Sequence, residues 1–467
     1  MPESVDLIVL GAGPAGLAAA WRAGRAGLST LVLERAPAAG GMAASFTVGG
    51  VRVDHGSHRL HPATAPGILA DLRRLLGDDL QERRRHGRLR VAGRWVGFPL
   101  AASELARALP PPMLARIGAE ALAEPVRRLR PGSPASYADA LRRGLGPTLY
   151  EALYAPFAVK LWGLPGEAID PEQARVRVSA DSPWKIARRL LRRGETGPGR
   201  SFHYPRRGFG QIVEALADAA TGAGADLRLG TEVTRLTAGD GGVEVSTADG
   251  ATFTAGHLFT TIPMPSLARI ASPPAPSGAV ESAARLGFRA MVLVYVVLDG
   301  VRPWSEFDAT YLPDPGTPIT RISEPPNYRS SADDPADRTV LCCELPCDPD
   351  DRWWSAPDAD LGELVTDTAA RLGLPPVRPA LVHVRRLRHV YPVYRIGYAE
   401  HLKALDTWAA TIPHVTTFGR LGLFAHDNTH HAIAMAYDAV DAIAGGRWDA
   451  QAWSASRRRF AAHVVED

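Results

Sequence analysis

Asp6-Leu-Ile-Val-Leu-Gly-Ala-Gly-Pro-Ala-Gly-Leu-Ala-Ala-Ala20, followed by Leu31-Val-Leu-Glu34, decides the fold of this chain. An apolar strand leads into a glycine turn and a helix, and a second strand then ends in an acid. Gly11 permits the tight turn, Gly13 lets the backbone approach a pyrophosphate, and Gly16 lets the helix pack closely on the strand. The N-terminus of the helix presents free N–H groups and a positive dipole end to the phosphates. The stretch therefore predicts a dinucleotide site in a Rossmann-like unit.

The residues that follow indicate which dinucleotide binds. Glu34 stands where an acid can hydrogen-bond a ribose hydroxyl. Gly40-Gly41-Met42-Ala43-Ala44-Ser45 comes next, where an NAD site would usually continue into an ordinary helix. The glycine pair can present N–H groups to a flavin diphosphate or ring edge, although it also fits a plain turn. This position favours FAD, and the cofactor candidates of the region are Gly11, Gly13, Pro14, Ala15, Gly16, Glu34, Arg35, Gly40, Gly41 and Met42.

The composition is that of a globular protein without a strong overall charge. The 467 residues suffice for two or three domains, and the apolar fraction of 46% is ordinary for a soluble fold. The net charge of +3 gives no field that argues for a nucleic-acid partner. Arginines crowd at 83–85, 127–130 and 188–193, which indicates either one basic face for an anionic substrate or a membrane, or a set of solvated helices. The basic amphipathic segment Trp184–Arg193 suggests weak peripheral membrane contact.

Cys342, Cys343 and Cys347 lie in one short segment and are the only cysteines. An odd, clustered set does not make a disulfide framework, so we expect a reducing cytoplasmic location. Buried structural thiols account for them better than a metal or redox site does. The apolar N-terminus lacks the basic region of a signal peptide, so we expect it to belong to the mature protein. No uncharged stretch approaches the length of a membrane span.

Segment composition divides the chain into an α/β fold with two insertions. We predict that residues 1–63, 203–265 and 413–467 assemble a discontinuous, Rossmann-like FAD-binding domain. Residues 64–202 are rich in Ala, Leu and Arg at helical spacing and are expected to form a mostly helical insertion. Residues 266–412 include a β-rich run and are expected to form an antiparallel-sheet substrate domain that covers the flavin. The sequence does not indicate an oligomeric state.

Three histidines stand three residues apart in Val53-Asp-His-Gly-Ser-His-Arg-Leu-His61. The spacing of His55, His58 and His61 suggests a metal site, but no acid or thiolate companion is evident and such spacings recur by chance. We therefore predict no metal. We favour a backbone loop that lies against the flavin ring, with His58 nearest the reacting face.

These motifs resemble those of the amine-oxidase-like flavoproteins, which include protoporphyrinogen oxidases, phytoene desaturases and UDP-galactopyranose mutases. The Gly-Gly-x-x-x-Ser pattern at 40–45 matches, and the histidine loop is similar to one that the mutases place over the isoalloxazine. Gly419-Arg-Leu-Gly-Leu-Phe424 resembles the closing flavin-binding turn, which implies that Arg420 lies near the flavin and Asn428 near its ring. The resemblance adds as cofactor candidates Val233, Gly419, Arg420, Asn428, Thr429 and Ile433.

Other segments resemble substrate motifs of the mutases. Tyr154-Ala-Pro-Phe-Ala-Val-Lys-Leu-Trp-Gly163 looks like their aromatic-rich segment, and Val390-Tyr-Pro-Val-Tyr394 fits the same group. Thr320-Arg-Ile-Ser-Glu324 resembles the motif whose arginine meets the substrate diphosphate, although Arg321 and Glu324 equally suit a structural ion pair. The resemblance implies the catalytic residues His58, Arg321 and His426, and the substrate-binding residues Phe157, Trp162, Arg177, Arg321 and Tyr394. The aromatic members of this set also fit a hydrophobic core.

The chain departs from the mutase pattern at three positions. His426 stands where the mutases carry a tyrosine that contacts diphosphate, and Asn428 stands where they carry an acid. Leu161 precedes Trp162, where the mutases have glutamine. These departures weigh against a nucleotide sugar, whereas Arg177 and Arg321 still suit an anionic substrate.

Three functions compete on these grounds. In the first, an FAD-dependent oxidase or desaturase transfers hydride from a small, anionic organic substrate to flavin N5. In the second, a redox-neutral mutase or isomerase acts on a nucleotide sugar, as UDP-galactopyranose mutase does. In the third, FAD is a structural element of a binding protein, which the histidine loop and the large substrate domain argue against. We favour the oxidoreductase, with FAD as cofactor and a small molecule as partner.

Overall fold

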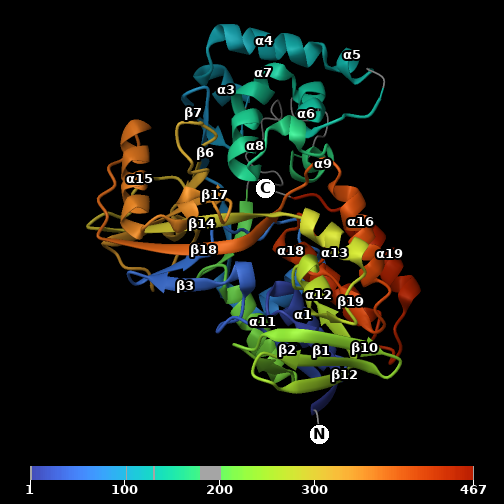
Figure 1. Cartoon of the computed structure of the whole chain (residues 1–467). Coiled ribbons are helices and arrows are strands. Elements are labelled where there is room, and N and C mark those ends of the chain that lie inside the picture. Colours follow the sequence, from blue (N-terminus) through green and yellow to red (C-terminus); the bar gives the residue numbers. More distant parts are fainter. Residues whose placement is uncertain (1–2, 101, 130–131, 179–200, 466–467) are drawn as a thin grey trace.

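A sheet built around the N-terminal strand forms the base of the molecule in Figure 1. In this sheet β1 (Glu3–Leu10) pairs in parallel with β2 (Thr30–Leu33) on one side and with β12 (Thr252–Thr260) on the other. β2 is buried along its whole length, which is why its sequence is a continuous apolar run. The computed structural model describes residues 3–100, 102–129, 132–178 and 201–465.

Strands from three separated parts of the chain complete this eight-stranded sheet. Its order is β13-β10-β11-β12-β1-β2-β9, and β19 pairs in parallel with the end of β12. The added strands are β9 (Asp226–Arg228), β10 (Val233–Gly239), β11 (Gly242–Thr247), β13 (Ala271–Ser272) and β19 (Val415–Thr417). The prediction of an α/β, Rossmann-like fold assembled from discontinuous segments is confirmed.

Helix α1 (Pro14–Arg25) is packed between two later helices on this sheet. It contacts α18 (Thr429–Asp441) and α11 (Gln211–Gly222), and its alanines are buried in the same core. Small side chains let the two helices approach α1 closely, so the turn that precedes α1 is firmly held. The chain closes with α17 (Gly419–Gly422) before α18 and α19 (Ala450–Phe460) after it.

A second, seven-stranded sheet lies above the first in Figure 1. Its strand β14, next to the edge strand, is buried except at its ends. Helix α15 (Asp358–Arg371) covers one face of β14, and the hairpin of β3 (Ser45–Val48) and β4 (Val51–Asp54) covers the other. In order across the sheet, the strands are β18 (Leu381–Pro392), β14 (Phe288–Asp299), β17 (Arg338–Cys347), β16 (Arg321–Ser323), β15 (Ala309–Tyr311), β6 (Gly87–Val91) and β7 (Arg94–Phe98).

Two strands of this sheet come from residues 64–202, which we predicted to be mostly helical. β6 pairs antiparallel with β7 and in parallel with β15, so residues 87–98 extend the second sheet. Nearby, β5 (Leu80–Arg84) pairs with β8 (Ser201–Pro205). The rest of this part is helical where described: α2 (Pro66–Leu76), α3 (Ala102–Ala108), α4 (Pro111–Leu122), α5 (Glu124–Arg128), α6 (Tyr137–Leu145), α7 (Pro147–Leu149), α8 (Ala155–Trp162) and α9 (Glu172–Val178).

Three helices of residues 266–412 lie with the nucleotide sheet rather than with the second sheet. α12 (Met264–Ile270), α13 (Ser277–Arg285) and α16 (Tyr398–Ala409) pack on one another. α12 also contacts β10, and α16 contacts β19. Within residues 266–412, the strands of the second sheet therefore begin at β14, after α12 and α13. A short helix α14 (Arg352–Ser355) follows β17.

The three cysteines lie on β17 as free, buried thiols, which confirms that they are not a disulfide framework. No helix in the described parts of the chain is long and apolar enough to cross a bilayer. The basic segment Trp184–Arg193, on which the predicted membrane contact depends, lies outside the described residues.

Candidate active site

The glycine turn after β1 is crowded on one side and open on the other. Gly11 has φ of +100°, and a Cβ there would lie 2.5 Å from Thr261 Oγ1. A Cβ on Gly16 would lie 1.9 Å from the carbonyl oxygen of Gly11, so this contact between turn and helix requires glycine. Around Gly13, in contrast, a Cβ would meet no atom within 4 Å. The Gly13 side of the turn is therefore open to a ligand phosphate.

Glu34, which directly follows β2, stabilises this turn through hydrogen bonds. Its Oε2 accepts a hydrogen bond from the Ala12 amide at 2.9 Å, and its Oε1 accepts one from the Ala36 amide at 2.8 Å. Two backbone donors thus hold the carboxylate in place. It borders the cavity described below, where a ribose hydroxyl can reach it.

Two turns that are distant in sequence meet the start of α1. The Gly40 amide donates to the carbonyl of Ala12 at 2.7 Å, and a Cβ on Gly41 would lie 3.5 Å from the Cα of Gly13. The closing turn reaches the same place, since a Cβ on Gly419 would lie 3.2 Å from the Cβ of Ala15. Both Gly41 and Gly419 have positive φ, of +55° and +80°. The three turns together form one wall.

A cavity of about 840 Å³ begins at this wall and extends to β14, β17 and β18 of the second sheet. Its volume is typical of a small-molecule or cofactor site. Most of the predicted cofactor residues line it: Gly11, Gly13, Pro14, Ala15, Glu34, Arg35, Gly41, Met42, His58, Val233, Gly419, Arg420, Asn428 and Thr429.

Gly16, Gly40 and Ile433, which were also predicted to bind the cofactor, are not among the lining residues. Gly16 faces the Gly11 carbonyl, and Gly40 is hydrogen-bonded to Ala12. Ile433 is fully buried in the core that joins α1 and α18. These three residues support the wall from behind, and their packing explains why these residue types occur there; their contact with a cofactor stays a prediction.

The cavity carries a clear surplus of positive charge. Nine arginines line it, against four carboxylates. A cavity with this balance attracts anions, and its low-dielectric walls strengthen the attraction. The arginines are Arg35, Arg59, Arg85, Arg177, Arg269, Arg321, Arg386, Arg388 and Arg420, and the acids are Glu34, Glu232, Glu344 and Asp427.

The histidine loop forms part of the lining and presents His58 to the cavity. The His58 ring stacks on Phe209 with a centroid separation of 5.2 Å. Burial is the main reason that the pKa of His58 falls to about 4, so the ring is neutral at neutral pH. Its Nδ1 is buried and has no hydrogen-bond partner in the described structure, so it is available to a bound molecule.

Asp54 anchors this loop from below. Its Oδ1 accepts hydrogen bonds from the Phe209 amide at 2.9 Å and from Ser45 Oγ at 2.5 Å, and its Oδ2 accepts one from the Tyr204 hydroxyl. The Asp54 carbonyl also accepts a bond from the Tyr295 hydroxyl. The backbone that presents His58 is therefore tied to β3, β8 and β14.

The loop histidines do not converge on a shared point. His55 Nδ1 lies 3.2 Å from the Gly41 carbonyl oxygen, while His58 stacks on Phe209. His61 lies under the neighbouring helix, with its ring centroid 6.4 Å from that of His430. Each ring thus serves a different contact.

Arg321 pairs with Glu344 rather than with Glu324. Its Nη2 lies 2.7 and 2.8 Å from the two Glu344 oxygens, and its Nε lies 3.0 Å from Oε1. Glu324 instead accepts hydrogen bonds from the Trp304 and Ser305 amides. Both Arg321 and Glu344 line the cavity, so the positive charge of the guanidinium is balanced there by the Glu344 carboxylate.

Arg177 and Arg420 flank the ring of Tyr391 on the cavity wall. Their guanidinium carbons lie 5.1 and 5.2 Å from the ring centroid. Arg420 donates to the backbone carbonyls of Asp427 and Val390, and its Nε has no partner in the described structure. Neither arginine forms an ion pair with a carboxylate of the described residues, so this pair can receive an anion.

Four predicted residues lie behind this wall instead of on it. His426, Trp162, Phe157 and Tyr394 are absent from the lining. The His426 ring lies 5.2 Å from that of Trp162 and 4.9 Å from that of Tyr394, and Trp162 packs edge-on to Tyr391. Tyr394 donates to the Phe424 carbonyl, and Phe157 packs against the core of α6 and α8. The rings of Trp162 and His426 pack against Tyr391 from behind, and substrate contact by these four residues stays a prediction.

Two lining residues were missed from the sequence. Glu344 is the partner of Arg321 across neighbouring strands, and nothing in the local sequence of β17 marks it. Tyr391 stands in the segment Val390–Tyr394 that we had singled out, but the choice fell on Tyr394. Tyr391 is on β18 and lines the cavity, whereas Tyr394 lies beyond the end of this strand and is buried.

The sequence and the fold both match known flavoproteins. The family model described as flavin-containing amine oxidoreductase matches residues 14–441. A reduced UDP-galactopyranose mutase has a similar structure, with a TM-score of 0.81, 20% identity, and coverage of 98% of this chain and 97% of that chain. No curated protein sequence matches.

Two oxidase structures show the same fold. A protein provisionally assigned as a protoporphyrinogen oxidase from an Exiguobacterium species has a TM-score of 0.72, 20% identity and coverage of 95% of this chain and 99% of that one. A cyclohexylamine oxidase from Brevibacterium oxydans has a TM-score of 0.70 at 17% identity, with the same two coverages. The family match spans most of the chain. The glycine turns and the cavity of the protein fit FAD. The chain therefore belongs to the flavin-containing amine oxidoreductases and is a flavoenzyme whose cofactor is FAD.

Proposed function

We propose that this protein is an FAD-dependent oxidoreductase of the oxidase or desaturase type that takes a hydride from a small, anionic organic substrate. One observation carries the proposal: the cavity joins the nucleotide turn to Arg177 and Arg420, which form no ion pair with a carboxylate in the described structure. The surplus of arginines would repel a protonated amine. We therefore favour an anion over an amine as substrate, despite the family's name.

The residues around the first turn fit FAD. The open space at Gly13 and the N-terminus of α1 suit the diphosphate, Glu34 suits a ribose hydroxyl, and Gly41 with Asn428 borders the space left for the ring. FAD, when bound, supplies the hydride acceptor. The protein's part is to bind the substrate, orient it and exclude water.

Arg177, Arg420 and His58 are assigned to the substrate. The two arginines would hold an anionic group of the substrate on either side of Tyr391. His58 is neutral, because burial lowers its pKa to about 4, so it can offer a hydrogen bond without adding charge. Arg321 keeps the loop in place through Glu344, which also accepts a hydrogen bond from the Ser57 amide at 2.8 Å.

The first test is an anaerobic absorbance spectrum of the purified protein, followed by dithionite reduction and admission of air. Rapid return of the oxidised flavin spectrum supports an oxidase. Candidate substrates are then added anaerobically, and bleaching by organic acids but not by amines supports the anionic class. Bleaching by amines alone would contradict it.

Arg177→Gln tests the anion site directly, with Arg395→Gln on the exposed surface as the control. We expect KM for an anionic substrate to rise by about tenfold or more in Arg177→Gln, because a charge-assisted contact contributes roughly 1.5–3 kcal/mol. Arg395→Gln should behave like the unaltered enzyme. An unchanged KM in Arg177→Gln would remove this arginine from the site.

A redox-neutral mutase acting on a nucleotide sugar is the second candidate. The extensive structural similarity to a UDP-galactopyranose mutase favours it, together with two arginines, Arg177 and Arg321, on one cavity wall. The test is conversion of UDP-galactopyranose by the reduced protein under anaerobic conditions, without net consumption of reductant. A reduced flavin that persists in air would direct the search toward this activity.

Two further proposals, on cellular location and on membrane contact, each depend on one short segment. We propose a reducing, cytoplasmic location, because all three cysteines are buried and unpaired. Weak membrane contact through Trp184–Arg193 is tested by sedimentation with anionic vesicles at low salt. Absence of co-sedimentation would dismiss it.

A further inference from the structure

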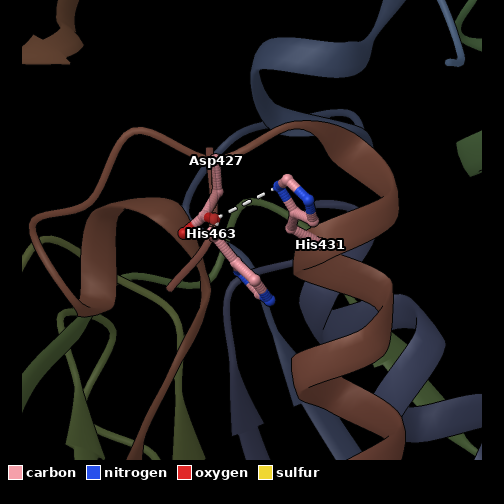
Figure 2. Close-up of side chains that lie close together, drawn as sticks. All are labelled: Asp427, His431 and His463. Atoms are coloured by element: carbon pink, nitrogen blue, oxygen red, sulfur yellow. Dashed lines mark hydrogen bonds and ion pairs between the residues drawn. The ribbon is translucent and has the colours of Figure 1, made fainter. Parts of the chain in front are cut away.

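Three side chains of types that bind metal ions lie close together although they come from separate elements: Asp427, His431 and His463. Asp427 lies in the loop before α18, His431 lies in the first turn of α18, and His463 follows α19. Figure 2 shows the His431 ring turned toward the Asp427 carboxylate. One nitrogen or oxygen from each of the three lies within 4.8 Å of the others.

The carboxylate at the centre of this cluster is buried and lacks a permanent countercharge. The Asp427 side chain is only 1% exposed, and its Oδ2 has no hydrogen-bond partner in the described structure. No lysine or arginine of the described residues forms an ion pair with it; Arg420 donates to its backbone carbonyl instead. His463 Nδ1 contacts Oδ1 at 2.9 Å, so Oδ2 is the carboxylate oxygen that remains open to a cation.

The hydrogen bonds of the cluster also leave a conflict at His431. Its Nδ1 accepts a hydrogen bond from the Asn428 amide at 3.3 Å and closes the cap of α18. An Nδ1 that accepts has no proton to donate, yet it faces Asp427 Oδ1 at 3.4 Å. Nδ1 and Oδ1 are then two acceptors without a proton between them, and a metal ion would bridge them once Nδ1 releases the Asn428 amide.

The atoms of the cluster are close enough to share one ion. Asp427 Oδ1 lies 3.4 Å from His431 Nδ1 and 2.9 Å, a hydrogen-bond distance, from His463 Nδ1. Ligands at about 2.1 Å from a tetrahedral zinc ion are about 3.4 Å apart, so only the contact with His463 would have to lengthen. The His431 and His463 rings stack with centroids 4.1 Å apart.

We propose that Asp427, His431 and His463 bind a divalent transition-metal ion of the zinc type. Imidazole nitrogen and carboxylate oxygen suit such ions, and three protein ligands leave one coordination position for water or another molecule. The site is distinct from the loop histidines whose spacing first suggested a metal. It does not depend on the reaction proposed above.

The ion would attach the end of the chain to the cofactor cavity. Asp427 and Val465 both line that cavity, and His463 lies two residues before Val465. Asn428, a predicted flavin neighbour, follows Asp427 directly. Metal binding would thus hold the closing turn and the C-terminal segment together beside FAD.

The test uses the FAD-loaded protein after treatment with a chelator, titrated with ZnCl₂ in a calorimeter at about pH 7. We expect about one Zn²⁺ per chain, with Kd tighter than about 10 μM. His431→Gln and His463→Gln keep a polar side chain but lose the imidazole ligand, and glutamine at position 431 can still close the helix cap. Each should weaken Zn²⁺ binding by at least about tenfold.

His401→Gln on α16 is the matched control and should bind Zn²⁺ as the unaltered protein does. Flavin absorbance and Tm show that each variant is folded and loaded. X-ray absorption at the zinc edge of the unaltered protein is a second measurement that needs no variant, and it should show two imidazole ligands. The proposal would be overturned by absence of Zn²⁺ binding, by Zn²⁺ binding in either cluster variant as tight as in the unaltered protein, or by a zinc site without imidazole.

Discussion

Gly13 and Gly16 stand three residues apart in one turn but face opposite surroundings. A Cβ at Gly13 would enter open space, whereas a Cβ at Gly16 would meet the Gly11 carbonyl at 1.9 Å. We expect Gly13→Ala to fold with a loss of less than about 1 kcal/mol, since its φ of −81° suits alanine and only the helix cap is weakened. FAD affinity should fall by about tenfold or more, because the methyl group would occupy the space left for the diphosphate.

Gly16→Ala is the complementary variant. Overpacking at this contact should lower the stability of the apoprotein by about 1–3 kcal/mol. Fluorescence titration with FAD and the Tm of the apoprotein separate the two effects. Normal FAD affinity in Gly13→Ala would contradict the conclusion that the Gly13 side of the turn is open to the diphosphate. A normal Tm in Gly16→Ala would contradict the conclusion that Gly16 is required for packing against Gly11.

The sequence was a better guide to the glycines than to the charged residues. A glycine turn is local, so its spacing alone predicts its geometry. The partner of Arg321 is not local: β16 pairs with β17, and Arg321 and Glu344 are direct neighbours across the two strands. Glu324, only three residues away, looked like the partner because strand pairing cannot be read from separation along the chain.

At the scale of elements, the histidine loop depends on Asp54. We expect Asp54→Asn to lower the free energy of unfolding by about 2–3 kcal/mol, because an amide cannot accept from three donors and leaves at least one buried N–H or O–H unsatisfied. Hydrogen exchange of residues 54–61 should accelerate. Tyr204→Phe removes one donor and leaves the carboxylate, so it should lower the free energy of unfolding by less than Asp54→Asn does. An equal or larger loss would contradict the central role of Asp54.

The hairpin of β6 and β7 shows why part of the predicted helical insertion is sheet. Gly87, Leu89 and Val91 are buried and alternate with more exposed arginines, which is a strand pattern. The turn between the strands is Ala92-Gly93, and both residues have positive φ, of +47° and +76°. Such turns are usually marked by Asn-Gly or Asp-Gly, so alanine hid this one among the alanine-rich helices.

His257 makes the junction of β12 and β19 sensitive to acid. Its Nε2 lies 2.9 Å from Thr416 Oγ1, its ring stacks on Trp448, and His414 lies nearby. Burial, with a smaller contribution from His414, lowers its pKa from 6.5 to about 4. The neutral ring therefore stabilises the fold fully above pH 6.5, and this stabilisation is lost as the pH falls toward 4.

The measurement is Tm against pH for the unaltered protein and for His257→Gln, which keeps a hydrogen-bonding group but does not titrate. We expect the Tm of the unaltered protein to fall more steeply between pH 6.5 and 4 than that of the variant. Comparing the two removes the contribution of other buried histidines, such as His58. Parallel curves would show that His257 is not the sensitive group.

At the scale of the whole molecule, FAD connects parts of the chain that are far apart in sequence. The cavity is lined by residues of the first turn, of α12 and the loop between β12 and α12, of β18, and of the closing turn before α18. A ligand that binds only the folded state stabilises it by about 2.7 kcal/mol at a hundredfold excess over Kd. Removal of FAD should therefore lower the Tm of the entire chain, and added FAD should restore it in a concentration-dependent way. AMP, which offers only one phosphate and the adenosine end, should restore less. A Tm that is the same with and without FAD would mean that the two sheets are held together by their own packing, and that the cofactor merely fills a finished cavity.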